Sequence, residues 1–176
     1  LHSMAQILRQ NRFKTGAFAF EKKEVAFDLD EEGKPVRVKF RQFGTANQLV
    51  EEFMLLANRL VAEFIGKTDK PKTFVYRIHD TPDPEKMENF RQFVKRFGYS
   101  MTEEKETALA KGMNKLLKKV KGKNEQNIIE TLALRAMAKA VYSTENIGHY
   151  GLAFRHYTHF TSPIRRYPDM MVHRLL

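Results

Sequence analysis

The sequence contains no cysteine among its 176 residues. That absence excludes a disulfide framework, a thiolate metal site and a cysteine nucleophile. Charged residues interrupt its apolar runs well short of the roughly 18 residues that a membrane-spanning helix needs. Its first residues are polar and basic, unlike those of a signal peptide. We therefore expect a cytoplasmic protein with no membrane span.

Acidic side chains are also scarce relative to basic ones. The chain has 31 Lys and Arg against 21 Asp and Glu, for a net charge of +10. That balance favours a polyanionic partner, nucleic acid first and an anionic membrane second. Hydrophobic residues make up 42% of the chain, enough for a core in one globular domain or in part of a larger one.

The positive charge is distributed unevenly. Residues 67–146 have 17 basic and 11 acidic side chains, whereas residues 147–176 have 4 and 1. The excess in the middle comes mostly from residues 111–123, with six lysines and no acid, a pattern typical of a solvated helix face. All four bases of the last segment are arginines, set among aromatic residues, which suits bidentate phosphate contacts and base stacking.

The hydrophobic pattern predicts an α+β fold, in which a small antiparallel sheet region packs with several helices. The expected strands cover residues 16–20, 25–29, 36–40 and 74–78, and the first three form a meander. The expected helices cover residues 2–11, 47–65, 85–97, 103–119 and 125–141, with a last one from Pro163 or Pro168 onward. Both ends of the chain lie within helical patterns, so we expect a portion of a domain that is truncated at both ends.

Residues 157–169 form the first candidate site. Prolines in this run place Arg165 and Arg166 around a helix N-terminus, where free N–H groups and two guanidinium groups would converge on a phosphate. The alternative is that one arginine pairs with Asp169 or another carboxylate while the other faces water.

Two adjacent glutamates, Glu51 and Glu52, form the second candidate site. On a helical wheel, Glu51 and Asn58 flank the apolar face, whereas Glu52 lies on an outer face with Arg59 and Glu63. We therefore expect Glu52 at the surface. Glu51 should be half-buried and in need of a partner such as an arginine, a metal-bound water or a ribose hydroxyl. The alternative is that Glu51 only forms a structural ion pair and has no functional role.

Two aromatic residues form the third candidate site. Phe18 and Phe20 point to the same side of the expected strand at residues 16–20, which is usual for core residues.

Two motifs carry a family resemblance. The string His-Phe-Thr-Ser-Pro-Ile-Arg-Arg-Tyr-Pro-Asp at 159–169, followed by Val-His-Arg at 172–174, closely resembles the signature of the ribonuclease II/ribonuclease R family, the RNB exoribonucleases. The run Val-Glu-Glu-Phe-Met-Leu-Leu-Ala-Asn at 50–58 also resembles that family. The resemblance covers most of the chain, and the signature is more similar to the ribonuclease R branch.

The resemblance implies a processive 3′-to-5′ exoribonuclease that hydrolyses single-stranded RNA to nucleoside monophosphates with a metal-activated water. Arg165 is then implied as a catalytic residue that stabilises charge on the phosphate in the transition state. Glu51 is implied as a second catalytic residue, near the 3′-terminal nucleotide. The implied substrate-binding residues are Arg166, Tyr167, Asn58 and, stacked on a terminal base, Phe20.

The resemblance further implies a divalent cation, Mg²⁺, held by clustered aspartates. The acids before Glu51 lie instead on an expected strand and turn, without a run of closely spaced aspartates. We therefore predict that the metal ligands lie outside this chain, as do the oligonucleotide-binding barrels of the family. The chain alone should be inactive, and the intact enzyme should be a monomer.

Other functions remain possible at this stage. One is a non-catalytic basic module that binds RNA. Another is a DNA-binding protein that uses the lysines of residues 111–123. A membrane-surface role has the least support, because the basic residues do not lie opposite a continuous apolar face.

Overall fold

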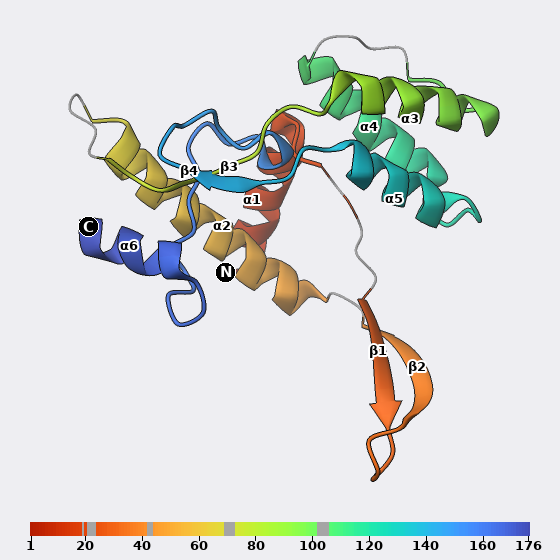
Figure 1. Cartoon of the computed structure of the whole chain (residues 1–176), viewed down its shortest axis with the longest axis horizontal. Coiled ribbons are helices and arrows are strands. Elements are labelled where there is room, and N and C mark those ends of the chain that lie inside the picture. Colours follow the sequence, from red (N-terminus) through yellow and green to blue (C-terminus); the bar gives the residue numbers. More distant parts are fainter. Residues whose placement is uncertain (19, 21–23, 42–43, 69–72, 102–105) are drawn as a thin grey trace.

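The computed structural model describes residues 1–18, 20, 24–41, 44–68, 73–101 and 106–176. Its helices are α1 (His2–Thr15), α2 (Thr45–Gly66), α3 (Pro84–Arg96), α4 (Glu106–Val120), α5 (Gln126–Ala136) and α6 (Tyr167–Leu175), with a short 3₁₀ helix at Tyr150–Leu152 (Figure 1). Its strands are β1 (Glu24–Leu29), β2 (Pro35–Arg41), β3 (Tyr76–Ile78) and β4 (Val141–Ser143). These strands form two separate antiparallel pairs, β1 with β2 and β3 with β4. The predicted α+β class is confirmed.

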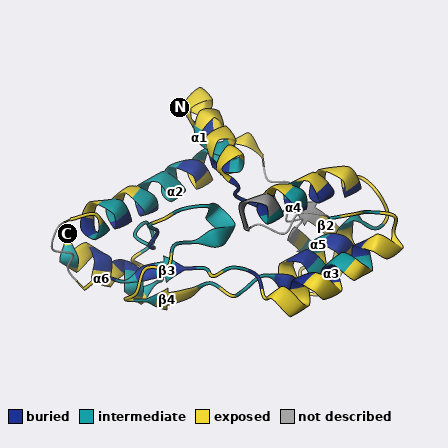
Figure 2. Cartoon of the chain, turned by 90° about the horizontal axis from the view of Figure 1, so that it is seen from above, coloured by how far each residue is buried: buried dark blue, intermediate teal, exposed yellow. Residues whose placement is uncertain are grey.

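Helices α2 to α6 and strand β3 divide between two apolar cores. In the first, α3, α4 and α5 pack together with Phe18. In the second, α2, β3 and α6 meet around Phe74, Tyr76 and Val172. Figure 2 shows that the buried faces of these helices turn toward one another within each group. The second core matters for function, because it fixes α2 against the segment that leads into α6.

Local sequence signals account for several element boundaries. The Asp83 carboxylate accepts hydrogen bonds from the N–H groups of Glu85 and Lys86, and Pro84 opens α3 without needing a donor. Of the two predicted starting points for the last helix, the structure uses Pro168, which lies in the first turn of α6. Residues 103–105 of the predicted fourth helix lie outside the described residues.

The predicted three-stranded meander is wrong. Helix α1 continues to Thr15, and Gly16 then takes a left-handed conformation with a φ of 112° that ends the helix. Phe18 follows in irregular backbone, and its N–H donates to the carbonyl of Gly151 rather than to a strand. Within the described part of this region, only β1 and β2 pair, in a hairpin that stands away from the body (Figure 1).

The predicted helix at 125–141 is also too long. Helix α5 ends at Ala136 because Met137 adopts extended backbone, with φ −75° and ψ 148°. The chain then forms β4, in which Val141 pairs with Ile78 of β3. Long-range pairing with β3 thus overrides the local helical pattern.

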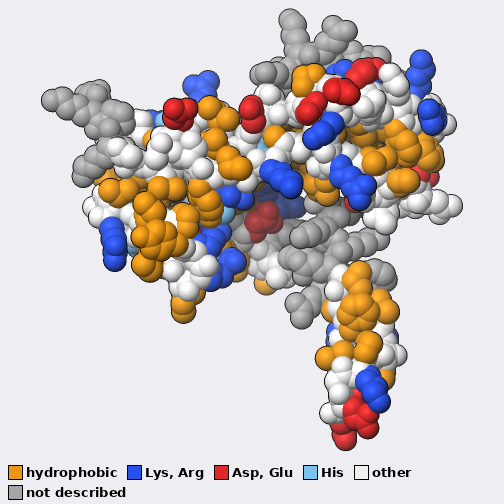
Figure 3. All heavy atoms as spheres, viewed as in Figure 1, with side chains coloured by type: hydrophobic (Ala, Val, Ile, Leu, Met, Phe, Trp, Pro, Cys, Tyr) orange, Lys and Arg blue, Asp and Glu red, His pale blue; other side chains and the backbone are white. Residues whose placement is uncertain are grey.

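The β1–β2 hairpin exposes an apolar face. Phe27 lies opposite Val38, and both side chains are more than half exposed. In Figure 3 hydrophobic side chains cover the stem of the hairpin, and charged side chains gather toward its tip. None of the helices in the described ranges combines the length and apolarity needed to cross a membrane.

Replacing Phe74 tests the second core. Its side chain is 1% exposed and meets Tyr76 edge to face at 4.9 Å. We expect Phe74→Ala to lower the free energy of unfolding by about 3–5 kcal/mol, because a cavity replaces the ring. Phe64→Ala is the matched control, since Phe64 is 72% exposed, and it should cost less than about 0.5 kcal/mol. Equal losses in chemical denaturation would contradict the assignment of this core.

Candidate functional site

A cleft of about 470 Å³ opens between the first half of α2 and the segment of residues 157–166. Its lining residues are Ala46, Asn47, Val50, Glu51, Met54, Leu55, Asn58, Tyr157, His159 and Arg166. Three residues predicted from the sequence therefore line one cavity: Glu51 and Asn58 of α2, and Arg166, which lies about a hundred positions further along the chain. The sequence had assigned no role to Tyr157 or His159.

Asn58 joins the two walls of this cleft. Its side chain is buried, and its Oδ1 accepts hydrogen bonds from the N–H groups of Phe160 at 2.9 Å and Thr161 at 3.2 Å. Its Nδ2 donates to the hydroxyl of Tyr157 at 3.2 Å. These bonds make Asn58 a positioning residue for the signature segment, and its direct contact with substrate stays a prediction.

Asp169 organises the two arginines of the signature. Its side chain is fully buried, and its Oδ2 accepts from the N–H of Ser162 and from the guanidinium of Arg166, each at 2.8 Å. Arg165, in contrast, is exposed and forms no ion pair within the described part of the chain. The alternative weighed from the sequence is therefore the observed arrangement: one arginine pairs with Asp169, and the other faces solvent.

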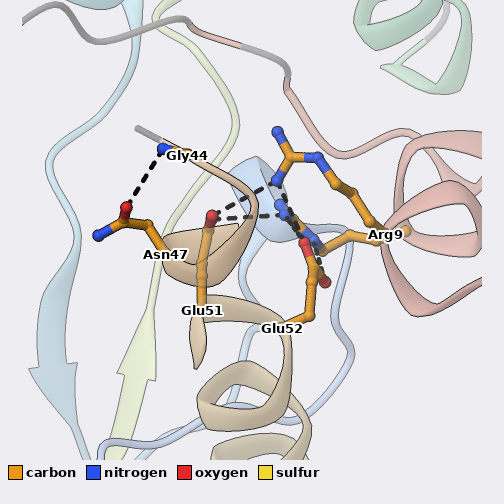
Figure 4. A network of polar contacts seen from close by, with 6 residues as sticks. Arg9, Gly44, Asn47, Glu51 and Glu52 are labelled. Atoms are coloured by element: carbon orange, nitrogen blue, oxygen red, sulfur yellow. Dashed lines mark hydrogen bonds and ion pairs between the residues drawn. The ribbon is translucent and has the colours of Figure 1, made fainter. Parts of the chain in front are cut away.

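The predicted surface position of Glu52 is wrong, whereas Glu51 is half-buried beside arginines, as predicted. The side chain of Glu52 is 3% exposed and lies in the fork of the buried Arg12, whose Nε donates at 3.2 Å and whose terminal nitrogen makes a second bond. Glu51 is 51% exposed, lines the cleft and lies 3.4 Å from Arg9 and 3.5 Å from Arg12. Figure 4 shows Arg9 reaching toward both carboxylates.

The physical reason for the burial of Glu52 is the position of α1. Helix α1 packs against the side of α2 that carries Glu52, and its arginines compensate the buried carboxylate. A helical wheel describes one helix alone, so it cannot show which polar edge a second helix covers. Neither Arg9 nor Arg12 had been considered as part of the site.

Aromatic rings continue from the cleft into the body of the protein. His159 lies against Tyr142 and Tyr157, and Tyr157 in turn meets His149, with ring centroids 5.3–5.8 Å apart. Burial, together with the positive charges of Arg166 and Arg77, lowers the pKa of His159 to about 4. Burial and the neighbouring His79 lower the pKa of His149 to about 3. Both rings are therefore neutral at physiological pH.

Three predicted site residues are not among those that line this cleft, and one of them is the exposed Arg165. Phe20 is partly buried against the core of α3, α4 and α5, with its ring 5.7 Å from that of Phe18. Tyr167 is exposed at the start of α6. Neither lines the cavity, and their contacts with substrate stay predictions.

The described carboxylates do not fit a divalent cation. In the described ranges, no three Asp, Glu or His side chains are grouped so that they could hold a metal ion. Glu51 and Glu52 face arginines, and Asp169 is held by Arg166, so their charge is already compensated. The chemistry that these residues can supply is binding, orientation and stabilisation of negative charge.

This arrangement belongs to a known class of proteins. The family model described as the RNB domain matches residues 1–176, and the chain is a member of that family, as its signature had predicted. The sequence is 45% identical over 175 residues to ribonuclease R of Thermotoga maritima and 39% identical over 176 residues to ribonuclease R of Aquifex aeolicus. These matches cover 98% and 100% of this chain but 24% of each relative.

The solved structures that resemble this chain also include ribonuclease R. RNase R of Mycoplasma genitalium, in complex with ribose methylated single-stranded RNA, matches 99% of this chain with a TM-score of 0.89 and 28% identity. The match covers 27% of that structure. Yeast Ssd1, described as a pseudonuclease, matches 76% of this chain with a TM-score of 0.62 and 31% identity. The chain thus spans about a quarter of the length of the ribonuclease R relatives.

Removing Arg12 tests the buried ion pair. We expect Arg12→Ala to lower the free energy of unfolding by about 3–5 kcal/mol, because the buried Glu52 carboxylate loses its two bonds to Arg12 and keeps only Arg9, at 3.4 Å. The double variant Arg12→Met with Glu52→Leu should lose much less, since no charge is then stranded. Lys34→Ala removes one partner of an exposed pair with Glu32 and should change the stability by less than about 0.5 kcal/mol. If Arg12→Ala behaves like Lys34→Ala in urea denaturation, the pair does not hold α1 to α2.

The lowered pKa values of the histidines predict a pH dependence of stability. Because His149 and His159 bind protons less readily in the folded chain than in the unfolded one, stability is complete above about pH 6.5 and falls as the pH drops toward 4. The melting temperature should therefore be lower at pH 5 than at pH 7.5. In His149→Asn the difference should shrink, since asparagine can accept the N–H of Leu152 as His149 does but does not titrate. An unchanged difference would exclude His149 as a contributor.

Proposed function

We propose that this chain supplies the RNA-binding and charge-stabilising part of a 3′-to-5′ exoribonuclease that degrades single-stranded RNA to nucleoside monophosphates. The observation that carries the proposal is the cleft, which Glu51 of α2 and Arg166 of the signature segment both line. Such a cavity offers an acceptor for hydroxyl groups on one wall and a donor for phosphate on the other. Relatives over the whole chain are ribonucleases R, and one solved relative holds single-stranded RNA.

Arg165 is the residue that we assign to the scissile phosphate. Its guanidinium is free of ion pairs in the described structure and follows a turn in which its own N–H donates to the carbonyl of Ser162. It precedes the N-terminus of α6, where backbone N–H groups also favour an anion. A guanidinium in this position gains interaction energy as charge develops on the phosphate, which lowers the barrier rather than only tightening binding.

We extend the proposal to the whole protein on the basis of its family. The intact enzyme would be a cytoplasmic monomer that uses Mg²⁺, with metal ligands other than the residues described above. The 176-residue chain alone would bind the 3′ end of RNA without hydrolysing it.

A non-catalytic RNA-binding module is the second candidate. The likeness to Ssd1, whose description is that of a pseudonuclease, favours it. The two candidates differ in whether the full-length protein that contains this chain releases mononucleotides from RNA.

Arg165→Ala in the full-length protein tests the proposed role. We expect the rate of hydrolysis of a 3′-tailed RNA to fall roughly 100- to 1000-fold, while the dissociation constant rises much less. Arg174→Ala is the matched control, because it removes an equal charge from the other end of α6 and should leave the rate near that of the parent.

An unchanged rate in Arg165→Ala would show that Arg165 is misassigned. No hydrolysis by the parent protein, with RNA binding retained, would favour the non-catalytic module. Robust, Mg²⁺-dependent turnover by the purified 176-residue chain would contradict the proposal that its metal ligands lie elsewhere.

A further inference from the structure

His159 lines the cleft, and only one of its two ring nitrogens has a hydrogen-bond partner among the described residues. It lines the cavity with Glu51, Asn58 and Arg166. Its Nδ1 lies 2.7 Å from the hydroxyl of Tyr142. Nε2, on the other side of the ring, has no hydrogen-bond partner among the described residues. It is also not one of the buried polar atoms that lack a partner. The ring therefore presents one free polar atom to its surroundings.

Tyr142 is the hydrogen-bond partner of Nδ1 of His159, so the direction of this bond decides which ring nitrogen carries the proton. Tyr142 lies on β4 and pairs in register with Arg77 of β3, whose guanidinium stands 4.6 Å from the centre of the tyrosine ring. A cation over the ring withdraws electron density and strengthens the phenol as a donor. A tyrosine hydroxyl that donates to Nδ1 leaves the imidazole proton on Nε2.

The charges around His159 keep this ring neutral. Arg166, Arg77 and Arg165 oppose its protonation, and Asp169 favours it. Burial is the largest cause, and together with the arginines it lowers the pKa of His159 to about 4. A neutral Nε2–H tautomer can donate to a ligand without adding another positive charge to a cleft that already contains Arg166.

We propose that His159 is a substrate-binding residue whose Nε2–H donates a hydrogen bond to a phosphodiester oxygen of the RNA strand in the cleft. This inference rests on the proposed function, and it adds a contact and a tautomer to it. A phosphodiester oxygen is the favoured acceptor because the donor lies on the arginine side of the cavity, where an anion is stabilised. The Glu51 carboxylate, which only accepts, suits the hydroxyl groups of a ribose instead.

The tautomer can be measured without RNA. Nitrogen-15 NMR of the 176-residue chain at pH 7 should show a protonated Nε2 and an unprotonated Nδ1 for His159. Tyr142→Phe should lose this preference, since the donor to Nδ1 is gone. A protonated Nδ1 in the parent chain would overturn the proposal.

Two substitutions at His159 separate the donor from the ring. The amide nitrogen of glutamine can take the place of Nε2–H, whereas asparagine is too short to do so. Binding of a short single-stranded RNA should weaken about fivefold to tenfold in His159→Asn and much less in His159→Gln, as expected for one hydrogen bond. Equal melting temperatures of the two variants establish that both are folded.

Modified RNAs identify the acceptor. With neutral methylphosphonate linkages, His159→Asn should cause no additional loss, whereas with 2′-deoxy nucleotides the loss should persist. The opposite pattern would assign the contact to a ribose hydroxyl and overturn the proposal. If the parent chain binds RNA and His159→Asn binds equally well, only this inference fails. If the parent chain binds no RNA, the proposed function fails with it.

Discussion

The cleft depends on the side-chain amide of Asn58. One of its walls is helix α2 and the other is the signature segment, and these parts of the chain are separated by about a hundred residues. Asn58 accepts from two consecutive N–H groups of that segment and donates to Tyr157, so three hydrogen bonds hold the walls together. Because the amide is buried, loss of any partner leaves a polar group without water to replace it.

Buried carboxylates perform a similar task for the basic residues. Asp169 holds Arg166 at the start of α6 and leaves Arg165 free, so two adjacent arginines acquire different roles. Glu52 holds Arg12, and the same cluster leaves the neighbouring Glu51 half exposed in the cleft. In both cases two residues of the same charge are adjacent in the sequence. One of them anchors the structure through a buried ion pair, and the side chain of the other reaches solvent, where a ligand can contact it. In a chain of net charge +10, this division leaves free the one guanidinium of the signature to which we assign the phosphate, that of Arg165.

Features that depend on neighbours in sequence were predictable. The α+β class, the cap at Asp83 and the helix that carries Glu51 all follow from local patterns. The family signature also indicated the cleft, because Arg166 belongs to it. Features that depend on distant packing were not predictable in the same way. The burial of Glu52 requires α1 beside α2, and the contact between Tyr142 and His159 requires the pairing of β3 with β4.

The most direct test of this account is an NMR titration of the nitrogen-15-labelled 176-residue chain with a short single-stranded RNA. The account predicts that the largest amide shift changes fall on the cleft, around Glu51, His159 and Arg165. Changes confined to the lysines of residues 111–123, with the cleft unaffected, would contradict it, because the RNA would then bind a solvated basic helix face rather than the site that Asn58 and Asp169 hold in place.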